Sequence, residues 1–144
     1  MPALVSRLFV ARLSSSLVLL FGGPPVMAQD APAIRVARVQ YSGGGDWYSD
    51  EESLVELLAF ARQNTLLDVN AEEETVELTS DNLFSYPYLY LTGHGNVTFS
   101  ASEADRLRRY LLQGGFLHID DNYGLDEYIR AELEKVFPEK ELVE

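Results

Sequence analysis

The chain has 144 residues, with 23 acidic and 11 basic side chains, and its net charge at neutral pH is −12. It has no cysteine, which excludes disulfide bonds and a thiol nucleophile. The acidic surplus argues against nucleic acid and anionic membrane surfaces as partners. It suits a cation, a neutral sugar or a basic protein surface, although solubility alone explains the acidity equally well.

The first 28 residues have the pattern of a secretory signal peptide. Arg7 and Arg12 precede a short apolar run, Leu17–Phe21, and Val26 and Ala28 fit the −3 and −1 positions of a cleavage site. The alternative is an uncleaved anchor, but the run is much shorter than the roughly 20 residues of a membrane-spanning helix. We therefore expect cleavage near Ala28 and export to the periplasm or the extracellular space, with no transmembrane span in the mature chain.

Strands and helices are expected to alternate after a linker at 29–34, which makes 35–144 a single α/β domain. In chain order, the expected elements are a strand at 34–41, a helix at 54–65, a short strand at 75–78, a helical turn at 80–83, a strand at 88–92, a helix at 101–112, a strand at 116–119 and a helix at 125–136. Capping-box patterns precede two helices, Ser49 with Glu52 and Ser100 with Glu103. No Asn-Gly hairpin signal separates the strands, so we expect a parallel sheet with helices on both faces.

Three segments with unusual residues each follow an expected strand. In a parallel sheet such loops meet at the carboxyl edge, where ligands bind. The candidate binding residues on these segments are Gly44, Gly45, Asp46, Trp47, Tyr48, Asn96, Asn122 and Tyr123, and the candidate catalytic residues are His94, Asp120 and Asp121. We expect the three segments to come together in space although they are far apart in the sequence.

The chemistry of these residues leaves several readings open. His94 suits acid–base or metal chemistry, or it simply bonds a neighbouring loop. Strand periodicity puts Asp120 on one face and Asp121 on the other, and one of them could instead cap the last helix. Together with His94 they could hold a divalent cation such as Mg²⁺, Ca²⁺, Mn²⁺ or Zn²⁺, or act as a pair in glycoside hydrolysis. His118, inside the strand, is expected to be a hydrogen-bonded core histidine rather than a ligand.

The glycines and aromatic residues carry weaker signals. The run Gly43–Gly45 resembles a phosphate-binding loop, but it lacks the G-x-G-x-x-G spacing and a Walker lysine, and Asp46 would repel phosphate. A tight turn explains it better. Trp47, Tyr48 and Tyr123 could hold a sugar ring, whereas packing is the more common role of aromatic side chains.

Three blocks, "YSGGGDWYSD", "YLTGHGNVTFS" and "LRRYLLQGGFLHIDDNYGLD", resemble domain-of-unknown-function family 4159 from about Arg35 to Glu144. That family is similar in fold to the class I glutamine amidotransferase-like group, which implies a flavodoxin-like parallel sheet. Family members continue beyond "FPEKELVE", which implies that this is the N-terminal portion of a larger, here incomplete, domain. The amidotransferase nucleophile is a cysteine, whereas Asp120 and Asp121 stand at about that place, so glutamine hydrolysis through a thioester is ruled out.

Two classes of function fit these observations. The first is a non-catalytic binding module for a carbohydrate, a small polar ligand or a protein partner. The second is a metal-assisted or carboxylate-based hydrolase that uses His94 with Asp120 or Asp121. Whether the protein is an enzyme is left open by the sequence, as is its cofactor, for which a divalent cation is one possibility.

Overall fold

The computed structural model describes residues 33–143, and every structural statement below concerns that part of the chain. The expected signal peptide, residues 1–28, lies outside the described residues, as does most of the expected linker. Between residues 33 and 143, no helix has both the length and the apolar character needed to cross a membrane.

Four parallel strands form one sheet in the order β2-β1-β3-β4. They are β1 (Val36–Gln40), β2 (Glu74–Glu77), β3 (Tyr88–His94) and β4 (Phe116–Tyr123). This is the order of the first four strands of the flavodoxin-like sheet. The predicted parallel α/β architecture is confirmed.

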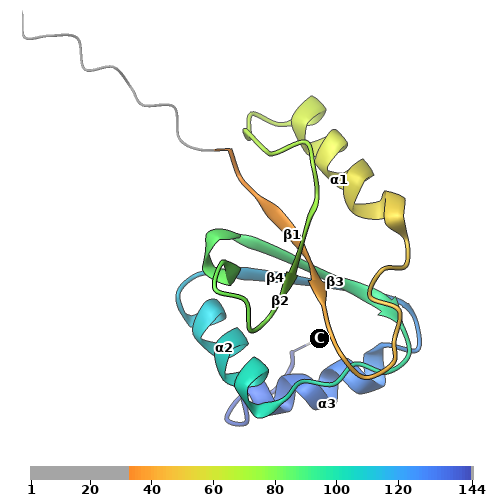
Figure 1. Ribbon diagram of the computed structural model, residues 1–144, viewed down its shortest axis with the longest axis vertical. Coiled ribbons are helices and arrows are strands. Elements are labelled where there is room, and N and C mark those ends of the chain that lie inside the picture. The colour runs from red at the N-terminus through yellow and green to blue at the C-terminus, as the bar shows by residue number, and fades with distance from the viewer. Residues whose placement is uncertain (1–32, 144) are drawn as a thin grey trace, which may run out of the picture. The chain divides into compact units, whose positions relative to one another are not determined.

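The helices cover both faces of the sheet, also as predicted. Figure 1 shows α1 (Glu51–Asn64) on one side, and α2 (Ala101–Leu112) and α3 (Asp126–Val136) on the other. A short 3-10 helix, η1 (Leu83–Ser85), precedes β3. In the sheet, β2 lies on one side of β1, whereas β4 lies on the opposite side of β3, so the two crossovers run in opposite directions. Because crossovers between parallel strands are right-handed, this reversal places α1 and α2 on opposite faces.

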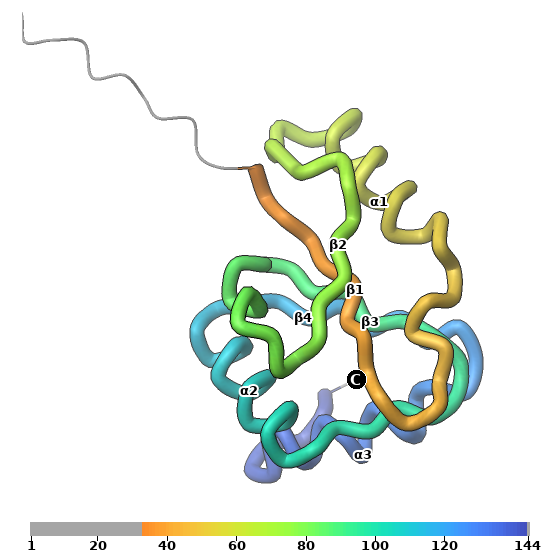
Figure 2. Tube along the Cα trace, in the orientation of Figure 1, coloured from red at the N-terminus to blue at the C-terminus, as the bar shows by residue number. Residues whose placement is uncertain are grey.

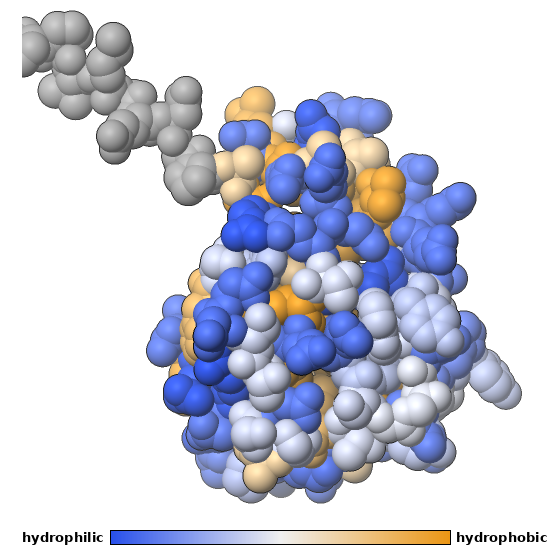
Figure 3. Space-filling view, in the orientation of Figure 1, coloured by the Kyte–Doolittle hydropathy of each residue, from blue (hydrophilic) through white to orange (hydrophobic). Residues whose placement is uncertain are grey.

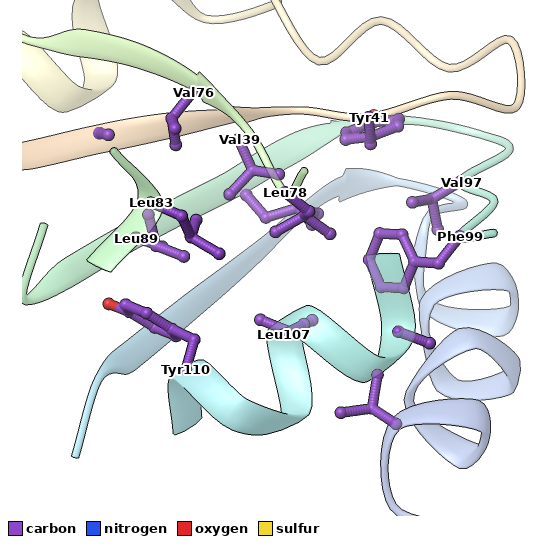
Figure 4. Close-up of a cluster of buried hydrophobic side chains, with 14 of the residues drawn as sticks. Val39, Tyr41, Val76, Leu78, Leu83, Leu89, Val97, Phe99, Leu107 and Tyr110 are labelled. Atoms are coloured by element: carbon purple, nitrogen blue, oxygen red, sulfur yellow. The ribbon is translucent and has the colours of Figure 1, made fainter. Parts of the chain in front are cut away.

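Two apolar clusters stabilise these layers. The larger one fills the space between the sheet and α2 and α3, where Leu89, Leu91 and Leu107 are fully buried. Figure 4 shows this cluster, with strand residues and helix residues pointing toward one another. The smaller one joins Leu54 and Leu58 of α1 to Val36, Val69 and Tyr90. Alternate residues of β1 and β3 therefore serve the two faces, as the period of a strand requires.

The two capping boxes have different outcomes. At α2 the Ser100 side chain accepts a hydrogen bond from the Glu103 backbone, and the Glu103 carboxylate accepts one from the Ser100 backbone, as predicted. At α1 the prediction is wrong: the N-cap is Asp50, in the left-handed region at φ 53°, and no side chain caps the helix. The guanidinium of Arg38 instead holds the carbonyl oxygens of Ser49 and Asp50.

Strands β3 and β4 run further than the sequence suggested. They pair with each other up to Gly93↔Asp121 and, after an irregularity, His94↔Tyr123. The residues at 120–123, expected in a loop, therefore belong to β4, because pairing with β3 continues past the apolar part of the strand. The carboxyl edge of the sheet therefore lies further along β3 and β4 than the sequence predicted.

The outer surface of α1 and the turn after it expose apolar side chains. Val55, Phe60, Leu66 and Leu67 are all exposed. In Figure 3, which has the orientation of Figure 1, hydrophobic patches lie in the upper part of the domain, where α1 is. This acidic protein thus exposes apolar side chains on and after α1.

Candidate site at the carboxyl edge of the sheet

The loops that follow β1 and β3 are joined by backbone hydrogen bonds. Gly45 N donates to Asn96 O at 2.8 Å, and Thr98 N donates to Ser42 O at 2.7 Å. In Figure 2 these loops and the end of β4 lie at the same end of the sheet. Asn122 of β4 is tied in as well, since its Nδ2 donates to Ser49 Oγ at 3.2 Å. The three predicted segments do come together.

An Asp46–His94 pair lies at the centre of this edge. One carboxylate oxygen of Asp46 accepts the backbone N–H of His94 at 2.5 Å, and the other lies 3.1 Å from the ring nitrogen Nδ1. The backbone hydrogen bond is the main reason that the pKa of Asp46 lies below its ordinary value, with the ring interaction adding to it. A carboxylate at Nδ1 favours the tautomer protonated there, so Nε2 is left with a lone pair. The His94 side chain is 50% exposed, so part of it is open to solvent.

The glycines of this edge permit a close approach of two loops. A Cβ on Gly45 would lie 2.6 Å from Asn96 O and 2.8 Å from His94 O. A Cβ on Gly93, which has φ +141°, would lie 2.2 Å from the Tyr41 hydroxyl oxygen. These contacts explain why Gly45 and Gly93 carry no side chain. Gly44 is exposed, with φ +96° and open space around it.

Tyr41 lies directly beneath the loops. Its hydroxyl is buried and has no hydrogen-bond partner among residues 33–143. Burial, with a smaller effect of the Asp46 charge, raises the pKa of Tyr41 to about 12. The phenol is therefore neutral at any physiological pH.

The two neighbouring aspartates serve different parts of the fold. Asp121 accepts the backbone N–H groups of Leu125 at 2.8 Å and Asp126 at 3.2 Å, so it caps α3. Asp120 lies on the other face, where it accepts the hydroxyl of Tyr90 at 2.8 Å. Neither bonds to His94, and no group of three or more His, Asp or Glu side chains between residues 33 and 143 is placed to hold a metal ion.

The aromatic residues divide into one packed ring and two exposed rings. Trp47 packs on the larger core cluster and meets Tyr48 edge-on at 5.6 Å between ring centroids. Tyr48 is 60% exposed and Tyr123 is 83% exposed. Tyr123 pairs with His94 across β3 and β4, and Tyr48 follows Asp46 by two residues. Two exposed tyrosines are therefore neighbours of the Asp46–His94 pair along the backbone, one in the sequence and one across the sheet.

The sequence did not point to Ser53 and Tyr90. The Tyr90 hydroxyl lies 3.2 Å from Ser53 Oγ and also donates to Asp120, and so links α1 to β4. Burial raises the pKa of Tyr90 above its ordinary value. The alternation in "YLYLT" could have indicated that Tyr88 and Tyr90 lie on one face of a strand. The partners of Tyr90 could not be predicted, because Asp120 and Ser53 lie 30 and 37 residues away in the sequence.

His118 also has a hydrogen-bond partner, the Tyr88 hydroxyl, which lies 2.8 Å from its Nδ1. This contact agrees with the expected hydrogen bonding of His118. It is only partly buried, however, because β4 is an edge strand.

The Asp46 interaction makes stability depend on acid pH. A carboxylate whose pKa is lowered by folding stabilises the native state above its unfolded pKa, near 3.9, and this contribution is lost as the pH falls through the lower folded pKa. We expect wild type to exceed Asp46→Asn in free energy of unfolding by less than about 1 kcal/mol above pH 5, because both groups are partly exposed. Urea unfolding from pH 3 to pH 7 should show this difference shrinking toward acid; a difference that stays constant with pH would contradict the assignment.

Comparison with known proteins adds a family but no activity. The model of the family described as "Domain of unknown function (DUF4159)" matches residues 35–144. No curated protein matches the chain. The matched region contains the whole sheet and all three loops of the candidate site. The chain belongs to the DUF4159 family.

Proposed function

We propose that this domain is an exported binding module that holds a small polar ligand at the carboxyl edge of its sheet, with a carbohydrate as the class that fits best. The observation that carries the proposal is the oriented Asp46–His94 pair, with the exposed residues Tyr48 and Tyr123 next to it along the backbone. Backbone hydrogen bonds between the loops hold the pair in place. A preorganised polar group loses little entropy on binding.

The chemistry of the edge matches that of a sugar. A sugar ring has apolar C–H faces, which pack on aromatic rings, and hydroxyl groups that need both donors and acceptors. His94 Nε2 offers an acceptor, while the phenol groups of Tyr48 and Tyr123 offer both. The three segments, 43–48, 93–96 and 120–123, contain no lysine or arginine, which disfavours phosphorylated ligands, and Asp46 adds a negative charge.

A hollow of about 650 Å³ lies elsewhere, along α3 and the residues after it. It is lined by Arg130, Leu133, Glu134, Phe137, Pro138, Lys140, Glu141 and Leu142. Size alone does not mark a binding site; polar groups that converge on a common point do. We therefore place the ligand at the edge of the sheet, at the oriented histidine and the exposed tyrosines of the neighbouring segments.

A second candidate function, hydrolysis with His94 as the acid–base group, is supported by the same pair. A carboxylate that orients a histidine ring and stabilises its protonated form is the arrangement used by acid–base histidines in hydrolases. In this reading the partner of His94 is Asp46, rather than Asp120 or Asp121. The hydroxyl to be activated would be that of water, since the described loops place no nucleophile beside His94 in any hydrogen bond.

Titration with sugars tests the proposal. Trp47 is the only tryptophan and touches Tyr48, so its fluorescence reports on the site. With protein expressed from the full sequence, glucose, N-acetylglucosamine and their β-linked disaccharides are the probes. We expect saturable binding by at least one probe, weakened about tenfold by Tyr48→Ala or Tyr123→Ala, which corresponds to about 1.4 kcal/mol for a lost ring contact.

The matched control is Tyr128→Ala, which removes an exposed tyrosine of α3, outside the three segments of the candidate site. It should bind like wild type. Binding that is weakened but still saturable in His94→Ala, without hydrolysis of nitrophenyl glycosides by wild type, supports the module. Hydrolysis that disappears in His94→Ala would replace it with the enzyme, and no saturable binding of any probe would count against the sugar proposal.

A further inference from the structure

The charged residues around the candidate site are of one sign. No lysine or arginine occurs at 39–61, 87–105 or 110–129, the stretches that contain the three segments of the site and the helix starts that follow them. Acidic residues occur in all three stretches. A ligand at this edge of the sheet therefore meets a negative electrostatic potential from these segments.

Several of these acids are explained by the helices that begin at this edge. Glu51 lies in the first turn of α1, Glu103 completes the capping box of α2, and Asp121 caps α3. A helix N-terminus carries a partial positive charge, which acidic side chains there compensate. Asp46 is different, because it lies in the loop between β1 and α1 and its hydrogen bonds go to His94.

The Asp46 carboxylate keeps both its charge and part of its surface. The side chain is 35% exposed, and no lysine or arginine between residues 33 and 143 pairs with it. Its nearest donor is the backbone N–H of His94, a neutral group, and this hydrogen bond lowers the pKa of Asp46. The carboxylate is therefore ionised at neutral pH, held on one side and open to solvent on the other.

A second observation at the same place is the Tyr41 hydroxyl. It is buried and has no hydrogen-bond partner in the described part of the chain. It lies against the backbone of Gly45 and Gly93, in the two loops that carry the Asp46–His94 pair. Buried polar groups in native proteins are nearly always hydrogen-bonded, so this hydroxyl points to a group supplied from outside the folded chain, a ligand or a water that bridges to it.

We infer that the ligand carries a protonated amino group, which Asp46 binds on its exposed side, so that the carbohydrate is an amino sugar. The inference rests on the proposed function, since it concerns the same site and the same class of ligand. A protonated amine adds a charge-assisted hydrogen bond to the contacts of the sugar hydroxyls. The exposed tyrosines Tyr48 and Tyr123 suit such a ligand as well, because the faces of phenol rings attract cations.

Two disaccharides that differ in charge test the inference. Protein made from the full sequence is titrated, with Trp47 fluorescence as the signal, at a pH at which the sugar amine is protonated. The probes are the β-1,4-linked disaccharide of glucosamine and that of glucose, which has hydroxyls in place of the amines. We expect the amino sugar to bind about tenfold more tightly at low salt. The difference should shrink to about twofold at about 0.5 M salt, which screens a partly exposed ion pair.

Charge-removing variants locate the effect. Asp46→Asn keeps the size of the side chain and removes its charge, so the preference for the amino sugar should fall to about twofold. The matched control is Glu72→Gln, which removes one negative charge from an exposed residue just before β2, at the opposite, amino edge of the sheet. It should keep the preference of wild type. Thermal unfolding verifies that both variants are folded, and the salt dependence of wild type needs no variant.

The outcomes separate this inference from the proposed function. If the glucose disaccharide binds as tightly as the amino sugar and Tyr48→Ala still weakens it, the inference is wrong and the binding module stands. A preference that persists in Asp46→Asn, that falls equally in Glu72→Gln, or that does not respond to salt would also overturn it. If neither sugar binds, the proposed function fails together with the inference.

Discussion

Replacing Gly93 with alanine is expected to lower the free energy of unfolding by about 3 kcal/mol or more. The backbone at Gly93 has φ +141°, a region that L-residues rarely adopt. The new Cβ would also lie 2.2 Å from the Tyr41 hydroxyl oxygen and 3.0 Å from Asp46 O. Urea unfolding followed by Trp47 fluorescence measures the loss.

Two controls separate the clash from the backbone strain. Gly95→Ala, at φ +72° with no atom within 4 Å of the new Cβ, should cost only about 1 kcal/mol. Tyr41→Phe removes the hydroxyl in question; because that hydroxyl is buried without a partner, this change alone should be neutral or slightly stabilising. In the Gly93→Ala background, Tyr41→Phe should recover part of the lost stability, and no recovery would show that the clash is not the cause.

Replacing Arg38 with alanine is expected to cost about 3 kcal/mol, because it empties the space of a buried side chain and removes the hydrogen bonds of its guanidinium. Its side chain is 2% exposed and donates to Ser49 O at 2.6 Å, Asp50 O at 3.1 Å and Glu73 at 3.2 Å. The guanidinium also lies 5.6 Å from the centre of the Tyr90 ring. Thermal and urea unfolding should both show the loss.

The matched control is Arg109→Ala, which removes the same side chain from an exposed ion pair with Asp105. Exposed pairs of this kind contribute little, so the change should stay within about 0.5 kcal/mol. Similar losses for the two arginines would contradict the role given to Arg38. Arg38→Ala should also disturb the start of α1, and an unchanged amide exchange rate at Ser53 would argue against that part of the prediction.

Local signals in the sequence predicted the secondary structure well. The Ser100–Glu103 capping box forms because both partners lie within one helical turn, so no other part of the chain is needed. The corresponding pattern at Ser49 fails because Arg38, eleven residues earlier in β1, takes up the carbonyl groups and sets a different backbone conformation. A local pattern is reliable where no distant group competes for the same atoms.

In the candidate site, too, some features could be predicted from the sequence and others depend on residues that are distant in the sequence. The position of the three segments at the carboxyl edge follows from the alternation of strands and helices, and so was available from the sequence. The partner of His94 was not, because Asp46 lies 48 residues away and the two meet only when β1 and β3 are neighbours. In the structure, the hydrogen-bond partner of His94 is Asp46 and not one of the aspartates of β4.

By itself, the amino-acid sequence determined the family, the parallel α/β class, the acidic charge and the absence of thiol chemistry, since composition, periodicity and residue order are properties of the chain alone. Only the tertiary structure decided the roles of Asp120 and Asp121, of which one bonds Tyr90 and the other caps α3. Adjacent residues in a strand point to opposite faces, and what each meets there is set by elements distant in sequence. The same holds for the length of β4, which depends on the pairing that β3 supplies.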